Sequence, residues 1–134
     1  LNSLQFSSTV ITADTLRQAS TIRSLTSLNM YQTNLDADVI RGMEHLTRLP
    51  MLQHLQINVV NDELARAISK LSTLTYLSIQ EGDLTDEGAA SLAQLTNLRG
   101  MYLTNSLRQI NVDALRKQMP QCQITFNLKN PSGR

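Results

Sequence analysis

The sequence contains few of the residues on which disulfide-rich, metal-binding or membrane-spanning proteins depend. Its 134 residues include one cysteine, no tryptophan and three prolines, and only 4% are aromatic. A single cysteine excludes an internal disulfide framework and leaves the redox compartment undecided. No apolar run approaches the roughly 20 residues that span a bilayer, so we expect no membrane insertion.

Net charge is also nearly absent. Twelve basic and eleven acidic residues give a formal net charge of +1. This balance gives no electrostatic reason to expect a nucleic acid or an anionic membrane, so the sequence predicts no nucleic-acid partner. Arg17, Arg41, Arg66 and Arg116 occur without interleaved aromatic residues, which indicates a solvated surface rather than a nucleic-acid patch.

What the sequence does contain is an internal repeat. Pairs of apolar residues recur at intervals of 22 to 27 residues, usually with a third apolar residue three positions earlier. The alternation within L-x-x-L-x-L predicts one short strand in each repeat. The pairs are Leu4/Phe6, Leu28/Met30, Leu55/Ile57, Leu77/Ile79, Met101/Leu103 and Ile124/Phe126.

A second apolar set with helical spacing follows each predicted strand. Its copies are Ile11/Leu16/Ala19/Ile22, Leu35/Ile40/Met43/Leu46, Val60/Ala65/Ile68/Leu71, Leu84/Ala89/Leu92/Leu95 and the fading Ile110/Leu115, where Met119 is the expected core residue. The residue after each first member is a good helix N-cap: Thr12, Asp36, Asn61, Thr85 and Asn111. An acid follows two positions later each time, which we interpret as stabilisation of the helix start rather than cation binding: Asp14, Asp38, Glu63, Glu87 and Asp113.

A unit of this size cannot bury its apolar face alone, so neighbouring units must stack. Strands then pair in parallel on one side and helices lie on the other. Because helices are about 10 Å wide and strands about 4.8 Å apart, we expect an arc with the strands inside.

These repeats resemble those of leucine-rich-repeat proteins over essentially the whole chain. The segment "LTYLSIQEGDLTDEGAASLAQLTNL" is similar to a bacterial subtype with a Thr-Asp-like helix start, and Thr9 and Thr33 match the threonine that this subtype often has at its ladder position. The resemblance implies an α/β leucine-rich-repeat solenoid with a concave parallel sheet and convex helices. It assigns residues 1–127 to about five repeats and a closing strand, and residues 128–134 to a polar C-terminal tail.

The pattern departs from this family in three places. The third repeat is shortened at "INVVND", which predicts an irregular ladder at Asn58 to Val60. The fourth repeat has Gly82 at the ladder position. The fifth is stretched, which predicts a bulging loop from Thr104 to Gln109.

The strand residues that alternate with the core pairs should face away from the helices, and none of them is charged. All three tyrosines of the protein belong to this set, and tyrosine provides a large contact area at low entropic cost. We therefore expect a binding face for a protein or peptide, with a glycan ranked below them. The alternative is that tyrosine and threonine simply suit exposed strand positions. The candidate binding residues are Asn29, Tyr31, His54, Gln56, Asn58, Tyr76, Ser78, Gln80, Tyr102 and Thr104.

No catalytic or metal-binding motif accompanies this face. The sequence has no Gly-rich phosphate loop, no paired-cysteine spacing and no Gly-x-Ser-x-Gly elbow. His54 and Cys122 belong to strands three units apart, roughly 14 Å, which is too far for a thiolate–imidazole pair. Cys122 is expected to be a small buried hydrophobic residue. We expect a binding module with no enzymatic activity, no cofactor and no metal.

The alternative function is a structural segment of a longer array or of a multidomain bacterial protein, with no ligand of its own. An apolar unpaired edge at Leu1 to Phe6 would favour that reading, as would self-association through this edge. The lack of an initiator Met and of a front cap also suggests a portion of a longer product. The resemblance includes secreted effectors, which slightly favours a secreted or cell-envelope location for a soluble domain.

Overall fold

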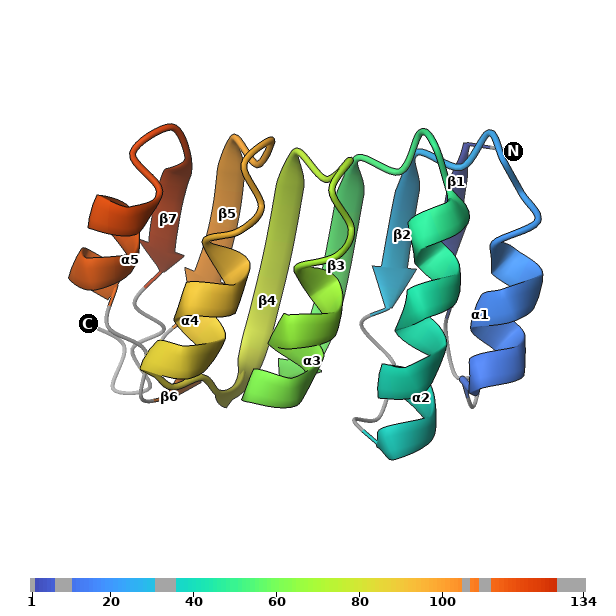
Figure 1. Cartoon of the computed structure of the whole chain (residues 1–134), viewed down its shortest axis with the longest axis horizontal. Coiled ribbons are helices and arrows are strands. Elements are labelled where there is room, and N and C mark those ends of the chain that lie inside the picture. The colour runs from blue at the N-terminus through green and yellow to red at the C-terminus, as the bar shows by residue number, and fades with distance from the viewer. Residues whose placement is uncertain (1, 7–10, 31–35, 105–106, 109–111, 128–134) are drawn as a thin grey trace.

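The computed structural model describes residues 2–6, 11–30, 36–104, 107–108 and 112–127. It has two layers, with the helices covering one face of a parallel β-sheet (Figure 1). The elements are β1 (Ser3–Gln5), α1 (Ala13–Ala19), β2 (Ser27–Met30), α2 (Ala37–Gly42), the 3₁₀ helix η1 (Met43–Arg48), β3 (His54–Val60), α3 (Asp62–Ile68), β4 (Tyr76–Asp83), α4 (Asp86–Leu92), β5 (Gly100–Thr104), β6 (Leu107–Arg108), α5 (Val112–Gln118) and β7 (Gln123–Asn127).

The strands follow one another across the sheet in the order β1-β2-β3-β4-β5-β7, and β6 pairs with β4. The first apolar residues of the predicted pairs are matched in register: Leu4, Leu28, Leu55, Leu77, Met101 and Ile124. The predicted positions of the strands are therefore confirmed. Stacked in this way, each strand presents one apolar row to the helices and one polar row to the other side.

The core lies between the two layers. Leu28, Leu55, Leu77 and Leu103 are completely buried there, and burial of each leucine contributes about 1.5–3 kcal/mol. Met119 is also completely buried, as the sequence predicted for the last helix.

One predicted core position in the second repeat, Ile40, packs at the margin of the core rather than within it. Ile40 is only half-buried, whereas Val39 is 2% exposed. The spacing used to choose core residues from the sequence did not include the third residue of each helix, which is Val39 in α2. An apolar helix face wider than about 100° also covers that position. Leu64 occupies the same position in α3 and is likewise buried.

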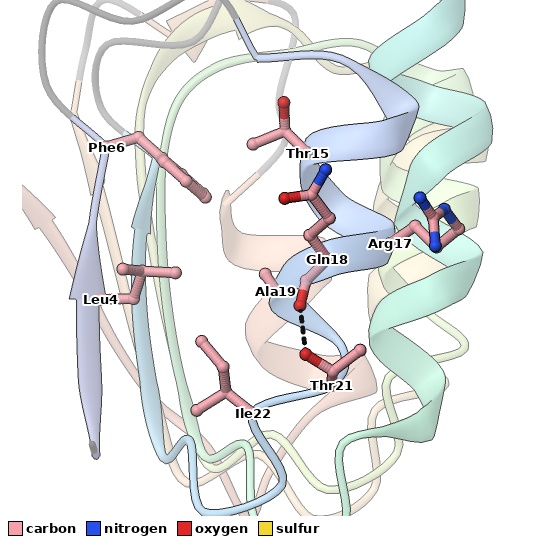
Figure 2. A pocket seen from close by; sticks show the side chains of 8 residues that line it. All are labelled: Leu4, Phe6, Thr15, Arg17, Gln18, Ala19, Thr21 and Ile22. Atoms are coloured by element: carbon pink, nitrogen blue, oxygen red, sulfur yellow. Dashed lines mark hydrogen bonds between the residues drawn. The ribbon is translucent and has the colours of Figure 1, made fainter.

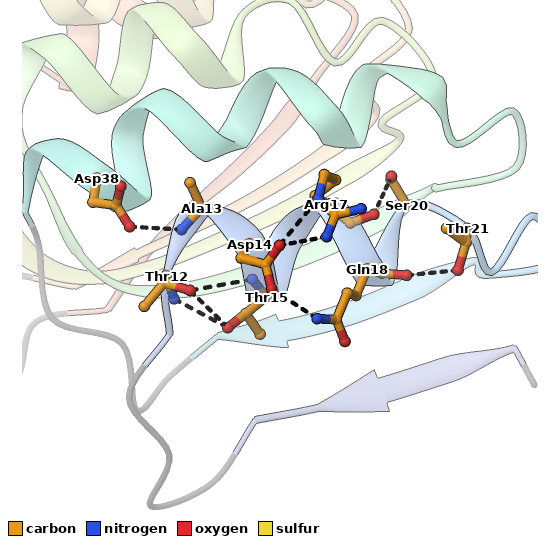
Figure 3. A network of polar contacts seen from close by, with 9 residues as sticks. All are labelled: Thr12, Ala13, Asp14, Thr15, Arg17, Gln18, Ser20, Thr21 and Asp38. Atoms are coloured by element: carbon orange, nitrogen blue, oxygen red, sulfur yellow. Dashed lines mark hydrogen bonds and ion pairs between the residues drawn. The ribbon is translucent and has the colours of Figure 1, made fainter.

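The predicted N-caps Thr12, Asp36, Asn61 and Thr85 all accept a backbone hydrogen bond from their own helix. Two carboxylates also reach the neighbouring repeat. Asp38 accepts from the backbone N–H of Ala13 at 2.7 Å (Figure 3), and Asp62 accepts from that of Thr85 at 2.9 Å. The helix starts are therefore joined to one another as well as capped.

The predicted irregularity at Asn58 to Val60 is wrong. β3 continues to Val60, and Val59 and Val60 keep the parallel register with Glu81 and Gly82. The reason is Gly82, whose φ of +126° suits glycine and whose missing Cβ would lie 2.0 Å from the Val60 carbonyl oxygen. Without a side chain there, β4 passes close enough to extend the pairing.

The predicted loop from Thr104 to Gln109 is also partly replaced by a strand. β4 pairs with β5 up to Ile79 and Leu103, and then pairs with β6 from Gly82 and Leu107 onward. The partner segment has one residue more than β4 between these two pairings. The pairing of β6 therefore brings residues 107–108 of the predicted loop into the sheet.

Several sequence-based expectations concern residues outside the described ones: Leu1, Thr9, Tyr31, Thr33, Leu35, Ile110, Asn111 and the tail 128–134. Within the described part of the chain, no helix combines the length and apolar character that crossing a membrane requires.

Candidate functional site: the strand face

We use "strand face" for the side of the sheet that the helices do not cover. Its residues form rows across the strands, because the strands are parallel and in register. The first row is Ser3, Ser27, His54, Tyr76, Gly100 and Gln123, and the second is Gln5, Asn29, Gln56, Ser78, Tyr102 and Thr125. A third row begins two residues further along each strand and includes Asn58, Gln80 and Thr104.

An aromatic pair occupies the first row. The rings of His54 and Tyr76 have centroids 6.0 Å apart and are tilted at 52°. Tyr76 lies across Gly100 of the next strand, because a Cβ at Gly100 would be 3.0 Å from Tyr76 Cδ1 and 3.5 Å from Cε1. His54 is exposed and Tyr76 half-buried. Gly100 thus provides the space in which the Tyr76 ring rests against the sheet.

The second and third rows hold polar side chains of graded exposure. Asn29, Gln56, Asn58, Gln80 and Tyr102 are half-buried, so each is supported by the sheet and still reaches solvent. The amide groups among them offer both hydrogen-bond donors and acceptors.

Two predicted binding residues are not accessible. Ser78 and Thr104 lie on the strand face but are each only 2% exposed. The Thr104 hydroxyl donates to the Gln80 backbone carbonyl of the neighbouring strand, so it serves the sheet. Residues on a strand face are screened by their larger neighbours in the same row, and for Ser78 those neighbours are Gln56 and Tyr102.

The titratable groups near the sheet show no catalytic arrangement in the described residues. Cys122 is 7% exposed, and burial raises the pKa of its thiol. It precedes β7, which lies three strands from His54 in β3, as the sequence predicted. No group of three or more His, Cys, Asp or Glu side chains in the described part is placed to hold a metal ion.

Two hollows lie away from the strand face, and the first is at the apolar N-terminal edge that the sequence indicated. A pocket of about 430 Å³ lies between β1 and α1, where Leu4, Phe6, Ala19 and Ile22 form its apolar lining (Figure 2). A second hollow of about 220 Å³ lies along α2 and α3, lined by apolar and charged residues that include Ile40. The longer interval between the second and third repeats is the one sequence feature that could have indicated the second hollow.

Comparison with solved structures supports the fold. The crystal structure of a TLR13–ssRNA13 complex matches 96% of this chain with a TM-score of 0.70 and 23% identity. The match covers 19% of that longer chain, so the present chain spans about a fifth of its length. A leucine-rich-repeat protein of Leptospira interrogans matches 81% of this chain and 39% of its own, with a TM-score of 0.44 and 20% identity. No protein-family model and no curated protein matches the sequence.

The TLR13 comparison corrects one sequence-based exclusion. The charge balance predicted no nucleic-acid partner, yet a chain with this fold occurs in a complex with single-stranded RNA. Net charge is a sum over the whole surface, whereas a bound polymer responds to charges within a screening length of about 8–10 Å. A net charge of +1 therefore does not exclude such a partner.

Three observations support the same fold: the register of the strands, the row of buried leucines and the structural match. The fold leaves the strand face uncovered by the helices. The chain is an α/β leucine-rich-repeat solenoid.

Proposed function

We propose that this chain is a non-enzymatic binding module that holds a protein or peptide on its strand face. The observation that carries the proposal is the Tyr76 ring resting across Gly100 beside His54. A ring supported in this way loses little conformational entropy on binding, because the sheet already restricts it. Half-buried aromatic residues at the centre of a face are typical binding hot spots.

The polar residues around the rings suit a polypeptide partner. Asn29, Gln56 and Gln80 present amides that can donate to and accept from peptide groups. Five strand spacings, from β1 to β7, span about 24 Å. This width suits an extended peptide, or one side of a small domain.

The proposal of binding rather than catalysis rests on the chemistry of the face. The accessible side chains among the candidates are amides, two phenols and one imidazole. These groups contribute aromatic surface and hydrogen bonds. Repeat solenoids typically use such a surface as a scaffold for recognition.

Single-stranded nucleic acid is a second candidate partner. The paired rings of His54 and Tyr76 could stack against bases, which contributes about 1–3 kcal/mol per base in such sites. The TLR13 structure supports the same possibility, since that protein is in a complex with ssRNA13. The neutral strand face favours the polypeptide.

The test is affinity capture from source-cell lysate and culture fluid. The immobilised chain would be compared with a Tyr76→Ala/Tyr102→Ala variant, shown by circular dichroism to be folded. Met51→Ala is the matched control, because Met51 is an exposed large apolar residue that lies off the strand face. We expect a protein that the parent and the control retain and that the double variant retains at least about tenfold less.

Other outcomes decide between the alternatives. Loss of the captured material after nuclease treatment, but not after protease treatment, would favour the nucleic acid. Equal capture by the parent and the double variant would move the site off the strand face. Capture of nothing would leave a structural segment as the better reading.

A further inference from the structure

Four basic residues outside the helix faces lie along one edge of the sheet. Arg23, Arg48, Lys70 and Arg99 all lie where a helix ends and the chain returns to the next strand. We call these four the basic edge; they follow the helix ends, which lie along the upper edge of the molecule in Figure 1. Each is exposed, and they come from four successive repeats.

Acidic residues are scarce along the same edge, although Glu44 and Glu63 line the hollow that Lys70 also lines. The segments 20–30, 45–61, 69–80 and 93–104 contain these four bases, no other Arg or Lys, and no Asp or Glu. The strand-face residues His54 and Tyr76 belong to these segments, close to Arg48 and Lys70 in sequence. The basic edge is therefore continuous with the first row of the strand face.

The residues of the basic edge differ from the arginines on the helix faces in whether they form ion pairs. On the helix faces, Arg17 pairs with Asp14, Arg41 with Asp38, Arg66 with Glu87 and Arg116 with Asp113. In contrast, Arg23, Arg48 and Lys70 form no ion pair with any carboxylate that the structure describes. Arg99 donates to the Thr96 backbone carbonyl at 3.0 Å, and this bond leaves its charge uncompensated.

Apart from Glu44 in η1, the described acids lie toward the opposite edge, where the strands end and the helices begin. Asp36 caps α2, Asp62 bonds Thr85, and Glu81 is exposed near the end of β4. A strand as long as β4 spans about 26 Å, more than twice the screening length of about 8–10 Å. A partner at one edge therefore interacts with the charges of that edge alone. The net charge of +1 does not describe this local interaction.

We infer that the polypeptide bound on the strand face carries its acidic residues over the basic edge, an inference that rests on the proposed function. A polypeptide can be acidic at this edge and neutral or basic at the other. A nucleic acid long enough to cross the face would also bring phosphates to the acidic edge. The charge arrangement thus selects an acidic flank in the partner and sets its orientation across the strands.

The test measures binding of a labelled oligoglutamate peptide by fluorescence anisotropy at low ionic strength. The edge variant is Arg23→Gln/Arg48→Gln/Lys70→Gln. The matched control, Arg17→Gln/Arg41→Gln/Arg66→Gln, changes the net charge equally but on the helix faces. We expect the edge variant to lose about tenfold in affinity and the control to stay within about twofold. Binding should weaken as salt is added, because these charges are exposed.

A strand-face variant keeps this test independent of the proposed function. Tyr76→Ala/Tyr102→Ala should bind oligoglutamate within about twofold of the parent, because the probe needs only the edge. If the capture experiment fails but oligoglutamate still binds, the result would therefore count only against binding on the strand face.

Three results would overturn the inference. The first is no binding of oligoglutamate by the parent even at low salt. The second is a loss of affinity in the control as large as that in the edge variant. The third is binding of oligouridine of equal charge more than about tenfold tighter than oligoglutamate, which would assign the edge to a nucleic acid that stacks its bases.

Discussion

Gly88 lies where α4 packs against α3, and no other residue fits there. A Cβ at this position would be 2.2 Å from Asp62 Oδ1 and 2.6 Å from Leu84 Cδ1. Asp62 is held in this place by its bonds to the backbone N–H and hydroxyl of Thr85. At the residue scale, one missing methyl group thus permits both the close approach of two helices and the bond that joins them.

Gly88→Ala should therefore destabilise the chain, although alanine is the better helix former. We expect a loss of about 1–3 kcal/mol in the free energy of unfolding, measured with urea, because the helices must separate. Ala90→Ser, at an exposed position of the same helix, is the control and should change stability by no more than about 0.5 kcal/mol. A stabilised Gly88→Ala variant would mean that the helix spacing is larger than the structure shows.

Asp38 makes stability depend on pH. Its bond from the Ala13 backbone N–H, and then its bond from Arg41, lower the pKa of the carboxyl group. A carboxyl group with a lowered pKa stabilises the fold above its unfolded pKa of about 4, and this contribution is lost as pH falls through the lower folded pKa.

Asp38→Asn should accordingly melt at a lower temperature than the parent at pH 7. The two melting temperatures should converge as the pH falls below about 4, because the parent then loses the same charge. Thermal melts followed by circular dichroism across this range would measure the difference. A difference that stays constant with pH would show that the charge of Asp38 does not contribute.

At the scale of elements, the helices depend on their first turns. They contain only six or seven residues, too few to be stable alone in water. Their starts are fixed instead by N-caps and by the carboxylates of neighbouring repeats. In Figure 3, the cap of α1 and the bond from Ala13 to Asp38 form one connected network.

Asn61→Ala should remove the cap of α3, whose Oδ1 accepts from the Leu64 N–H at 2.8 Å. We expect a loss of about 1 kcal/mol in the free energy of unfolding. Gln94→Ala, at an exposed site after α4, should be nearly neutral and serves as the control. Equal stability of the Asn61→Ala variant and the parent would mean that water replaces the cap without cost.

At the scale of the whole molecule, the core is continuous but its contacts are local. Each strand touches only its neighbours in the order β1-β2-β3-β4-β5-β7, apart from the short β6. β2 and β5 are three strands apart, about 14 Å, whereas β3 and β4 are adjacent. Nearest-neighbour contacts of this kind are typical of solenoids.

Core substitutions should therefore add when they are distant and couple when they are adjacent. In urea unfolding, Leu28→Val and Leu103→Val should add within about 0.5 kcal/mol. Leu55→Val and Leu77→Val, which face each other in register, should deviate from additivity by about 0.5 kcal/mol or more. Strong coupling of the distant pair would indicate packing that extends across several repeats.

Part of the candidate site could be predicted from the same sequence pattern that predicted the strands. The alternation that buried Leu55 and Leu77 also placed Gln56 and Tyr76 on the other side of the sheet. The exposure of the strand-face side chains could not be predicted from the sequence, because it depends on the size of the neighbouring side chains in the same row. Ser78 and Thr104 are buried for that reason, while His54 is exposed.

By itself, the sequence determined the periodic features of this protein: the repeat, the strand register and the helix starts. These depend on residues close together in the chain, whose spacing and hydrogen-bonding groups act locally. Only the tertiary structure decided which features of successive repeats meet. Stacking brought Tyr76 over Gly100, extended β3 and β4 past Gly82, and gathered scattered bases into one edge. Such contacts join residues more than twenty positions apart, so no local pattern could specify them.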